Sequence, residues 1–515
     1  MKALLEPIKE IARFDELFRD LKKGTAGVTV ISGCLESQKA HMIAGLSEDA
    51  PVRLLIAENE LKAKELYEDY RLYDAETLYY PAKDLIFYQA DIHGNLLIRQ
   101  RLQVIQALLE RKEVTIITSV GGCMDFLLPL GVFEKHCIHL RNDSELDLDK
   151  IRKELVRLGY ESTFQVESTG QFSVRGGILD IYPLTEQNPI RIELWGDEID
   201  SIRSFDAESQ RSIENLEEIT IYPASELILT EDTIARGVKA IKKEAKAQST
   251  KFRDKMMTEE AARIRHAAEE ICDQIGEGEI LQGVEQYLHY FYPETVSFLE
   301  YLPENSRIFL DEPNRIIECA DALEAEFQES VSHRLEKGYL LPGQAKLMCS
   351  TAELVAKLNR RGCVAVSLME PQKGEWNIRD EFSVTVKSVN SYNNQFPLLV
   401  KDLKSWKKAG YRIVLASPSR TRAQHLAEDL QNEEIPAFYS ENEERVLKPG
   451  EVMLIHGAAR RGFEYPMQKF VLITETDIFG KEKKKNRKKS EYSGQKIQNF
   501  ADLSIGDYVV HESHG

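Results

Sequence analysis

The stretch Gly33–Ala40, GCLESQKA, decides how the first part of the chain is interpreted. It follows the apolar run Val28–Ile31 and leads into HMIAGL, so the order is strand, loop, lysine and helix. That order is typical of a phosphate-binding P-loop, G-x-x-x-x-G-K-[ST]. Gly33 and Lys39 match the pattern, whereas Gln38 stands where the second glycine belongs. The stretch keeps the layout of a P-loop and departs from its residues.

Each departure removes one part of nucleotide chemistry. Gln38 carries a side chain where backbone N–H groups close around phosphates, and Ala40 has no hydroxyl for Mg²⁺. The matching acidic motif is indicated by IFLDEP, in which Asp311 and Glu312 follow an apolar run. We therefore predict a RecA-like scaffold that keeps the shape of a nucleotide-binding domain without its chemistry, with no catalytic residue and no metal site. An active ATPase is the alternative.

Length and charge limit the class of protein. A chain of 515 residues, 42% hydrophobic and 30% charged, predicts three or four globular domains. Its 67 basic and 85 acidic residues give a net charge of −18, so any nucleic-acid contact has to be local. Seven scattered cysteines without a C-x-x-C pair indicate reduced thiols in a cytoplasmic protein. No secretory signal or membrane-spanning apolar run is evident.

The alternation of apolar runs and helical patterns predicts a multidomain α/β fold. In it, a degenerate RecA/P-loop-like domain with a parallel sheet is interrupted by a small α+β antiparallel domain and followed by a second αβ domain. The predicted segments are 1–136 (P-loop-like), 137–224 (α+β), 225–350 (helices and strands that complete the first domain), 380–477 (second αβ domain), 478–497 (basic linker) and 498–515 (the start of a further domain, cut short). The chain is expected to be a piece of a longer protein.

The linker contains GKEKKKNRKKS, with seven basic residues and one acid in Lys481–Lys489. Like charges at this density repel one another, which favours a solvated segment. No other basic face is evident from the sequence. We therefore predict weak, salt-sensitive binding of duplex DNA through this run alone.

The strand PIRIELWGDEID (Pro189–Asp200) predicts a protein-docking face, because successive side chains of a strand alternate between its two faces. The core set is Ile190, Ile192 and Leu194, and the outward set is Arg191, Glu193 and Trp195. An outward Trp costs solubility unless a partner covers it, and Arg and Trp are enriched at interface hot spots. Arg175, beside two glycines in FSVRGG, joins the predicted face. The alternative is that Trp195 packs beneath a neighbouring helix.

Three stretches carry a resemblance to known proteins. TGQFSVRGGILDIYPLTEQNPIRIELWGDEIDSIRSFDAESQRS (Thr169–Ser212) resembles the domain shared by the excision-repair protein UvrB and the bacterial transcription-repair coupling factors. LLERKEVTIITSV is similar to the strand that enters this domain in both. GDYVVHESHG, at the end of the chain, resembles the opening of the RNA-polymerase-interacting domain of the coupling factors, which UvrB lacks. The chain is thus similar to the N-terminal part of the coupling-factor family.

This resemblance implies a UvrB-like module, a third domain, a basic linker and the first residues of the polymerase-binding domain. Intact family members recognise stalled RNA polymerase and displace it with a C-terminal, ATP-driven translocase on double-stranded DNA. ATP and Mg²⁺ belong to those motor domains, so no cofactor is expected in this fragment. Members then recruit UvrA through the second domain. The family's UvrA-contacting residues match Arg175, Arg191, Glu193 and Trp195 here, and the family often has Phe at the last position.

The alternative function is that of an ATP-dependent, UvrB-type damage-binding helicase subunit. That function would require an intact P-loop and a long Tyr-rich hairpin that inserts into DNA. The segment between Tyr80 and Arg101 is too short for such a hairpin together with the helix predicted near Leu97. The sequence therefore favours the docking part of a coupling factor.

Overall fold

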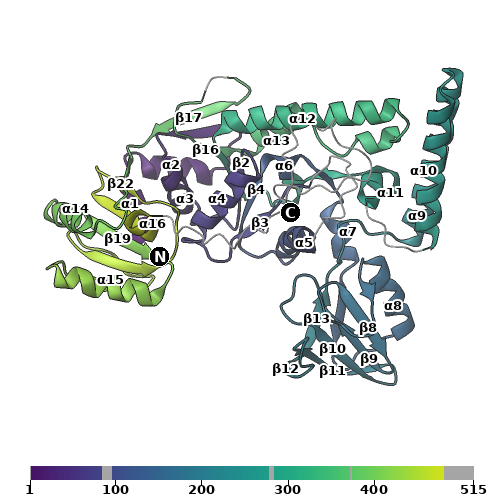
Figure 1. Ribbon diagram of the computed structural model, residues 1–515, viewed down its shortest axis with the longest axis horizontal. Coiled ribbons are helices and arrows are strands. Elements are labelled where there is room, and N and C mark those ends of the chain that lie inside the picture. Colours follow the sequence, from purple (N-terminus) through teal and green to yellow (C-terminus); the bar gives the residue numbers. More distant parts are fainter. Residues whose placement is uncertain (1, 84–94, 278–282, 372–373, 481–515) are drawn as a thin grey trace, which may run out of the picture.

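The computed structural model describes residues 2–83, 95–277, 283–371 and 374–480. Figure 1 shows a central domain 1, a domain 2 that projects from it at the lower right, and a domain 3 at the left. The predicted multidomain α/β class is confirmed. The basic linker beyond residue 480 and the segment 498–515 lie outside the described residues.

Domain 1 contains a parallel sheet of seven strands in the order β17-β1-β16-β15-β2-β4-β3. The strands are β1 Val28–Ser32, β2 Val52–Ala57, β3 Leu78–Tyr80, β4 Val114–Ser119, β15 Arg307–Asp311, β16 Cys363–Val366 and β17 Ile378–Ser383. Sequences such as VTVIS and VTIITS are buried at every position, as expected for central strands covered on both faces. The sheet extends domain 1 to Ser383, past the predicted limit at 350 and into the predicted range 380–477. The sequence interpretation missed this because β16 and β17 are short and pair with β1, more than 300 residues earlier.

Helices and short elements surround this sheet. They are α2 Phe14–Lys22, α3 Glu36–Gly45, α4 Glu60–Tyr70, α5 Asn95–Leu109, α6 Val120–Met124, β5 Phe126–Leu127, α7 Leu130–Lys135, η1 Val284–Tyr287, α11 Leu288–Phe291, β14 Val296–Ser297, η2 Phe298–Tyr301, α12 Pro313–Glu336, η3 Pro342–Ala345 and α13 Thr351–Arg361. The α4 helix begins at Glu60 because the Asn59 side chain caps it and accepts a hydrogen bond from the backbone N–H of Lys62.

Domain 2 is inserted into domain 1 and contains a six-stranded sheet in the order β12-β11-β10-β9-β8-β7. Its elements are β6 Ile138–Arg141, α8 Leu148–Arg157, β7 Glu161–Ser162, β8 Gln171–Arg175, β9 Ile178–Ile181, β10 Ile190–Trp195, β11 Glu198–Phe205, β12 Ser212–Leu216 and β13 Glu218–Ile221. The entering and leaving strands, β6 and β13, pair with each other, so the domain is attached through a narrow neck.

A buried ion network fixes this neck. The Arg101 guanidinium, completely buried, lies 2.8 Å from Glu226 and 3.2 Å from Asp125. It also lies 4.2 Å from the centre of the Tyr80 ring. Asp125 precedes domain 2 in the chain and Glu226 follows it. The Arg101 side chain of domain 1 therefore binds both segments that connect domain 2 to domain 1.

Domain 3 contains its own six-stranded sheet, in the order β18-β22-β23-β19-β21-β20. Its elements are β18 Lys387–Ser388, α14 Phe396–Lys408, β19 Arg412–Ser417, α15 Arg420–Asn432, β20 Ala437–Tyr439, β21 Val452–His456, β22 Phe463–Tyr465, β23 Phe470–Thr474 and α16 Glu475–Phe479. The first helix of the chain, α1 (Lys2–Lys9), packs on α3 and contributes Ala3 and Leu4 to the core of domain 3. Domains 1 and 3 therefore share a hydrophobic contact.

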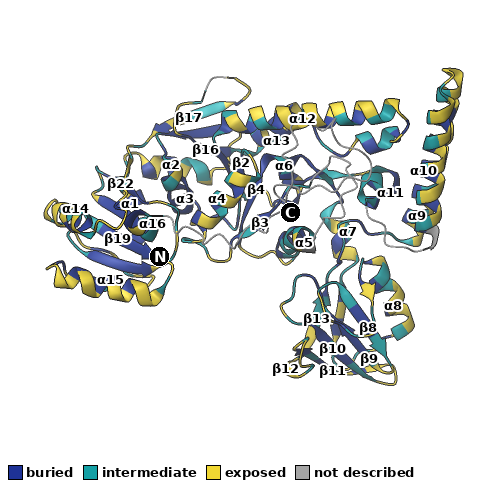
Figure 2. Cartoon of the chain, in the orientation of Figure 1, coloured by how far each residue is buried: buried dark blue, intermediate teal, exposed yellow. Residues whose placement is uncertain are grey.

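Two long helices, α9 (Glu231–Asp254) and α10 (Thr258–Glu277), form the helical projection at the right of Figure 1. Exposed residues run along its length (Figure 2). No helix within the described ranges combines the length and apolar composition needed to cross a membrane.

Candidate functional site

The degenerate P-loop lies where β1 leads into α3, as predicted. The helix begins at Glu36, inside the stretch that a P-loop keeps as a loop. The backbone N–H groups of Gln38 and Lys39 both donate to the Leu35 carbonyl, at 2.8 and 3.0 Å. These two donors are used inside the helix and are not available to cradle a phosphate.

The start of the loop is bound to the neighbouring strand end. The backbone N–H groups of Gly33 and Cys34 donate to the carbonyls of Leu368 and Ser367, at 3.1 and 3.0 Å. Gly33 has φ +82°, and a Cβ at this position would lie 2.2 Å from the Val384 carbonyl oxygen. Backbone packing is therefore sufficient to explain the glycine.

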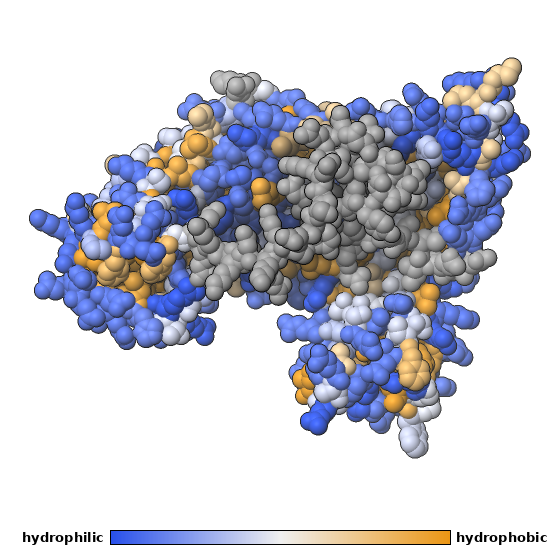
Figure 3. Space-filling model, viewed as in Figure 1, coloured by the Kyte–Doolittle hydropathy of each residue, from blue (hydrophilic) through white to orange (hydrophobic). Residues whose placement is uncertain are grey.

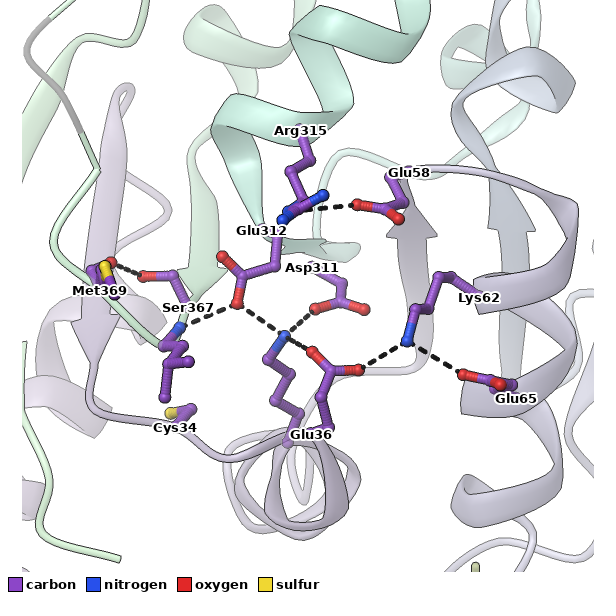
Figure 4. A network of polar contacts seen from close by, with 12 residues as sticks. Cys34, Glu36, Glu58, Lys62, Glu65, Asp311, Glu312, Arg315, Ser367 and Met369 are labelled. Carbon is purple, nitrogen blue, oxygen red and sulfur yellow. Dashed lines mark hydrogen bonds and ion pairs between the residues drawn. The ribbon is translucent and has the colours of Figure 1, made fainter.

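The carboxylates of Glu36, Asp311 and Glu312, labelled in Figure 4, surround one ammonium group, which is that of Lys39. Its Nζ donates to Glu36 at 2.6 Å, to Asp311 at 2.7 Å and to Glu312 at 2.8 Å. The lysine side chain is 1% exposed. The predicted acidic motif is thus brought to the predicted lysine, whose ammonium donates to both carboxylates of the motif.

The charge interactions within this cluster shift the pKa values of its members. Burial alone would lower the pKa of Lys39, but the surrounding carboxylates, Asp311 foremost, raise it above its ordinary value. Burial raises the pKa of Asp311 to about 6, against the opposing effect of Lys39. Glu36, Asp311 and Glu312 each present an oxygen within 4.8 Å of the others, a spacing that suits a cation, and the lysine ammonium occupies that position.

The outer side of α3 contacts domain 3. Gln38 is completely buried, and its Nε2 donates to the Tyr465 hydroxyl at 2.5 Å. The Ser37 hydroxyl donates to the Gly462 carbonyl at 3.1 Å. The His41 ring, also buried, contacts the Leu4 carbonyl at 2.7 Å and the Tyr465 hydroxyl at 3.2 Å. Gln38, which replaces the second consensus glycine, therefore joins two domains together with its neighbours Ser37 and His41.

The predicted docking face lies on the open side of the domain 2 sheet. Ile190 and Ile192 are buried, as the alternation predicts, and Leu194 is partly buried against the same core. Trp195 is 85% exposed, so the alternative in which it packs beneath a helix is wrong. Glu193 is half-buried and pairs with Arg203 of the next strand.

The two arginines of this face are held by one buried acid. Arg191 donates to both carboxylate oxygens of Asp180, at 2.7 and 2.9 Å, and Arg175 donates to the same group at 2.8 Å. Asp180 is 1% exposed and the Arg191 side chain only 15%. The prediction that Arg191 lies on an exposed face needs correction, because cross-strand pairing with Asp180 draws its guanidinium inward and leaves it mostly buried.

Phe164 is a second exposed aromatic residue that the sequence interpretation missed. It is 83% exposed, and the Arg175 guanidinium lies 5.9 Å from its ring centre. The backbone N–H of Leu194 donates to Gly177, which brings the Trp195 end of β10 beside the turn that follows Arg175. Phe164 lies in a loop whose sequence has no strand periodicity. The residues around it, such as Gln165 and Val166, therefore gave no indication that its side chain is exposed.

The fold and the two sites define a class of protein. A P-loop-type domain, closed at its phosphate loop, carries an inserted antiparallel domain whose open face presents a Trp and anchored arginines.

Comparison with known proteins narrows this class. Residues 138–227 match the family described as the UvrB interaction domain. The transcription-repair-coupling factor of Bacillus subtilis is 32% identical over 519 residues, covering 97% of this chain and 43% of that protein. Coupling factors of Staphylococcus aureus are 30% identical over 525 residues, covering all of this chain and 43% of theirs. The similarity to the N-terminal part of coupling factors is thereby confirmed. The chain spans less than half the length of these relatives.

Proposed function

We propose that this chain is the N-terminal portion of a transcription-repair coupling factor and that its domain 2 docks UvrA. In this proposal, docking brings nucleotide excision repair to stalled RNA polymerase. The ATP-driven translocase on double-stranded DNA, with its ATP and Mg²⁺, and the polymerase contact belong to the rest of the full-length protein. The protein acts in the cytoplasm.

One observation carries the proposal: Trp195 stands 85% exposed on the domain that matches the UvrB interaction family. Beside it, Asp180 holds Arg175 and Arg191 in fixed positions, so their guanidinium groups are preorganised. Preorganised side chains lose little entropy on binding, and an apolar ring next to charged groups is typical of a hot spot.

The alternative, an ATP-dependent UvrB-type helicase subunit, is not favoured. It would need the Lys39 ammonium to meet a nucleotide phosphate, and that ammonium is already bound by three carboxylates. We therefore propose that this part of the protein is not an enzyme and binds no nucleotide cofactor.

The test measures UvrA binding by the 515-residue chain and by its Trp195→Ala variant. Loss of a central hot-spot Trp is expected to cost about 2 kcal/mol or more, roughly thirtyfold in affinity. Met467→Ala, which truncates a similarly exposed side chain on domain 3, serves as the matched control. Normal UvrA binding by Trp195→Ala, with an unchanged melting temperature, would place the docking face elsewhere.

A further inference from the structure

The α9 helix carries a face of unpaired positive charge in a chain whose net charge is −18. Its cationic residues, with the C-cap residue Lys255, are Arg236, Lys239, Lys242, Lys243, Lys246, Lys251, Arg253 and Lys255, and all are exposed. Within the described residues, none of them forms an ion pair. The expectation that no basic face exists outside the linker is therefore wrong.

The spacing places these charges on one side of the helix. Arg236, Lys239, Lys243 and Lys246 follow one another at intervals of three or four residues, which are neighbours on a helical surface. The single acid between Arg236 and Arg253 is Glu244, whose carboxylate turns inward and accepts the backbone N–H of Gly343 at 3.2 Å. Between Arg236 and Arg253 the face is therefore continuous, and the exposed acids Asp232 and Asp254 lie only at its two ends.

The acids of the neighbouring helix do not neutralise this face. The two helices pack along a separate seam, where Ile241, Ala245 and Ser249 are buried and the Ser249 hydroxyl donates to the Ala261 carbonyl at 2.9 Å. Two exposed acids of α10 pair within α10 itself, Glu269 with Arg265 at 3.9 Å and Glu270 with His266 at 3.7 Å. Figure 3 shows the projection as predominantly hydrophilic and clear of domains 2 and 3.

The dimensions of the face suit a nucleic-acid backbone. From Arg236 to Arg253 the helix rises roughly 26 Å, at about 1.5 Å per residue. A DNA strand presents one phosphate per roughly 3.4 Å of axis, so a helix of this length lies within reach of several phosphates. Lys and Arg dominate the face, and such side chains contact phosphates in a way that positions a duplex without reading its bases.

We propose that this basic face of α9 binds the phosphate backbone of duplex DNA without sequence preference. The surface lies on a different domain from the UvrA-docking face, so each proposal can fail without the other. We assign duplex DNA as the partner by charge complementarity, because α9 exposes no large apolar side chain with which to enter a membrane or an apolar groove on a protein.

The experiment measures fluorescence anisotropy of a labelled 30-base-pair duplex with the 515-residue chain, as a function of salt. All variants are made in a background in which the seven basic residues of Lys481–Lys489 are changed to Gln. The test variant combines Lys239→Ala, Lys243→Ala and Lys246→Ala. The matched control combines Lys401→Ala, Lys404→Ala and Lys408→Ala, which removes three exposed lysines from α14 with the same change in net charge.

We expect the α9 variant to bind the duplex about tenfold more weakly than its parent at low salt. The slope of log binding constant against log salt concentration should become shallower by about 0.9 for each phosphate contact removed. The α14 control should stay within twofold of its parent, and UvrA binding by the α9 variant should not change. If the two triple variants weaken duplex binding equally, the proposal is overturned, because the loss would then depend only on the change in net charge and not on the position of the lysines. Loss of all duplex binding in the Gln background, or tighter binding of poly-glutamate than of the duplex, would also overturn it.

Discussion

Replacing Lys39 with Met tests whether the closed P-loop is a structural element. In a working P-loop the lysine binds phosphate, and its loss abolishes nucleotide binding. In this structure the lysine compensates the buried Asp311, with Glu36 and Glu312 alongside. We therefore expect Lys39→Met to destabilise domain 1, although the substitution nearly preserves side-chain length.

The size of the expected loss of stability follows from how far the acids paired with Lys39 are buried. Glu36 is about half exposed and can turn toward water, so its pair with the lysine contributes little. Asp311 has an 8% exposed side chain and cannot do so. Removing one partner of a buried pair costs about 3–5 kcal/mol. For a domain of this size that corresponds to a fall of roughly 6–20 °C in the melting temperature of domain 1.

The assay is thermal unfolding with a control and a pH series. Lys62→Met removes another lysine that pairs with Glu36, at 3.2 Å, from a more exposed position, and it should cost less than about 1 kcal/mol. Without Lys39 the pKa of Asp311 rises above its present value near 6, so the folded variant binds a proton more tightly than the unfolded chain. The stability deficit of Lys39→Met should therefore shrink as the pH falls from 8 to 5.5.

Two results would refute this reasoning. If Lys39→Met melts like the parent chain, the three ion pairs contribute nothing to the fold. If the deficit is the same at every pH, Asp311 is not the group left uncompensated. Recovery of most of the stability in the Lys39→Met, Asp311→Leu double variant would identify the pair directly, because replacing both charges by apolar groups is close to neutral.

Three further predictions concern the rest of the chain. Calorimetry with ATP and Mg²⁺ should detect no micromolar binding, and such binding would contradict the closed loop. Burial lowers the pKa of His41 to about 4, so as the pH falls below 6.5 the unfolded chain takes up a proton that the folded chain does not. His41→Gln should then remove up to roughly 3 kcal/mol of acid destabilisation between pH 6.5 and 4, seen as a flatter curve of melting temperature against pH. Arg191→Ala should lower the melting temperature of domain 2 more than Arg175→Ala, because Arg191 holds Asp180 with two hydrogen bonds and Arg175 with one; the reverse order would exclude Asp180 as the cause.

The sequence predicted the elements whose pattern is local. The Val28–Ile31 run was predicted to be a strand and is observed as β1, Val28–Ser32, and the sequence of α4 is equally local in its pattern. These segments have strong periodicity and clear ends, such as the Asn59 cap. In contrast, β16 and β17 join domain 1 by pairing with β1 across the whole first half of the chain, and no local pattern encodes that partner.

The site residues also divide into those that a local pattern predicts and those that depend on partners far away in the sequence. Strand alternation was sufficient to predict that Trp195 points outward, because that property depends only on β10. The burial of Arg191 depends on Asp180, which lies opposite it in another strand, so it required the register of the sheet. The basic face of α9 was readable in VKAIKKEAKAQSTKFR, but a net charge averaged over 515 residues concealed it.

The altered P-loop is better explained as an exchange of functions than as decay. A phosphate cradle needs open backbone N–H groups, a free ammonium and space above the helix end. Here α3 begins early and uses its own N–H groups, Asp311 holds the ammonium, and Gln38 stands in place of the second glycine with a side chain bonded to Tyr465 of domain 3. Each change removes a feature that a phosphate cradle needs and also adds an internal contact. A helix end that moved with nucleotide hydrolysis could not remain bonded to a second domain, so a fixed joint between domains 1 and 3 and a working nucleotide site are mutually exclusive at this position.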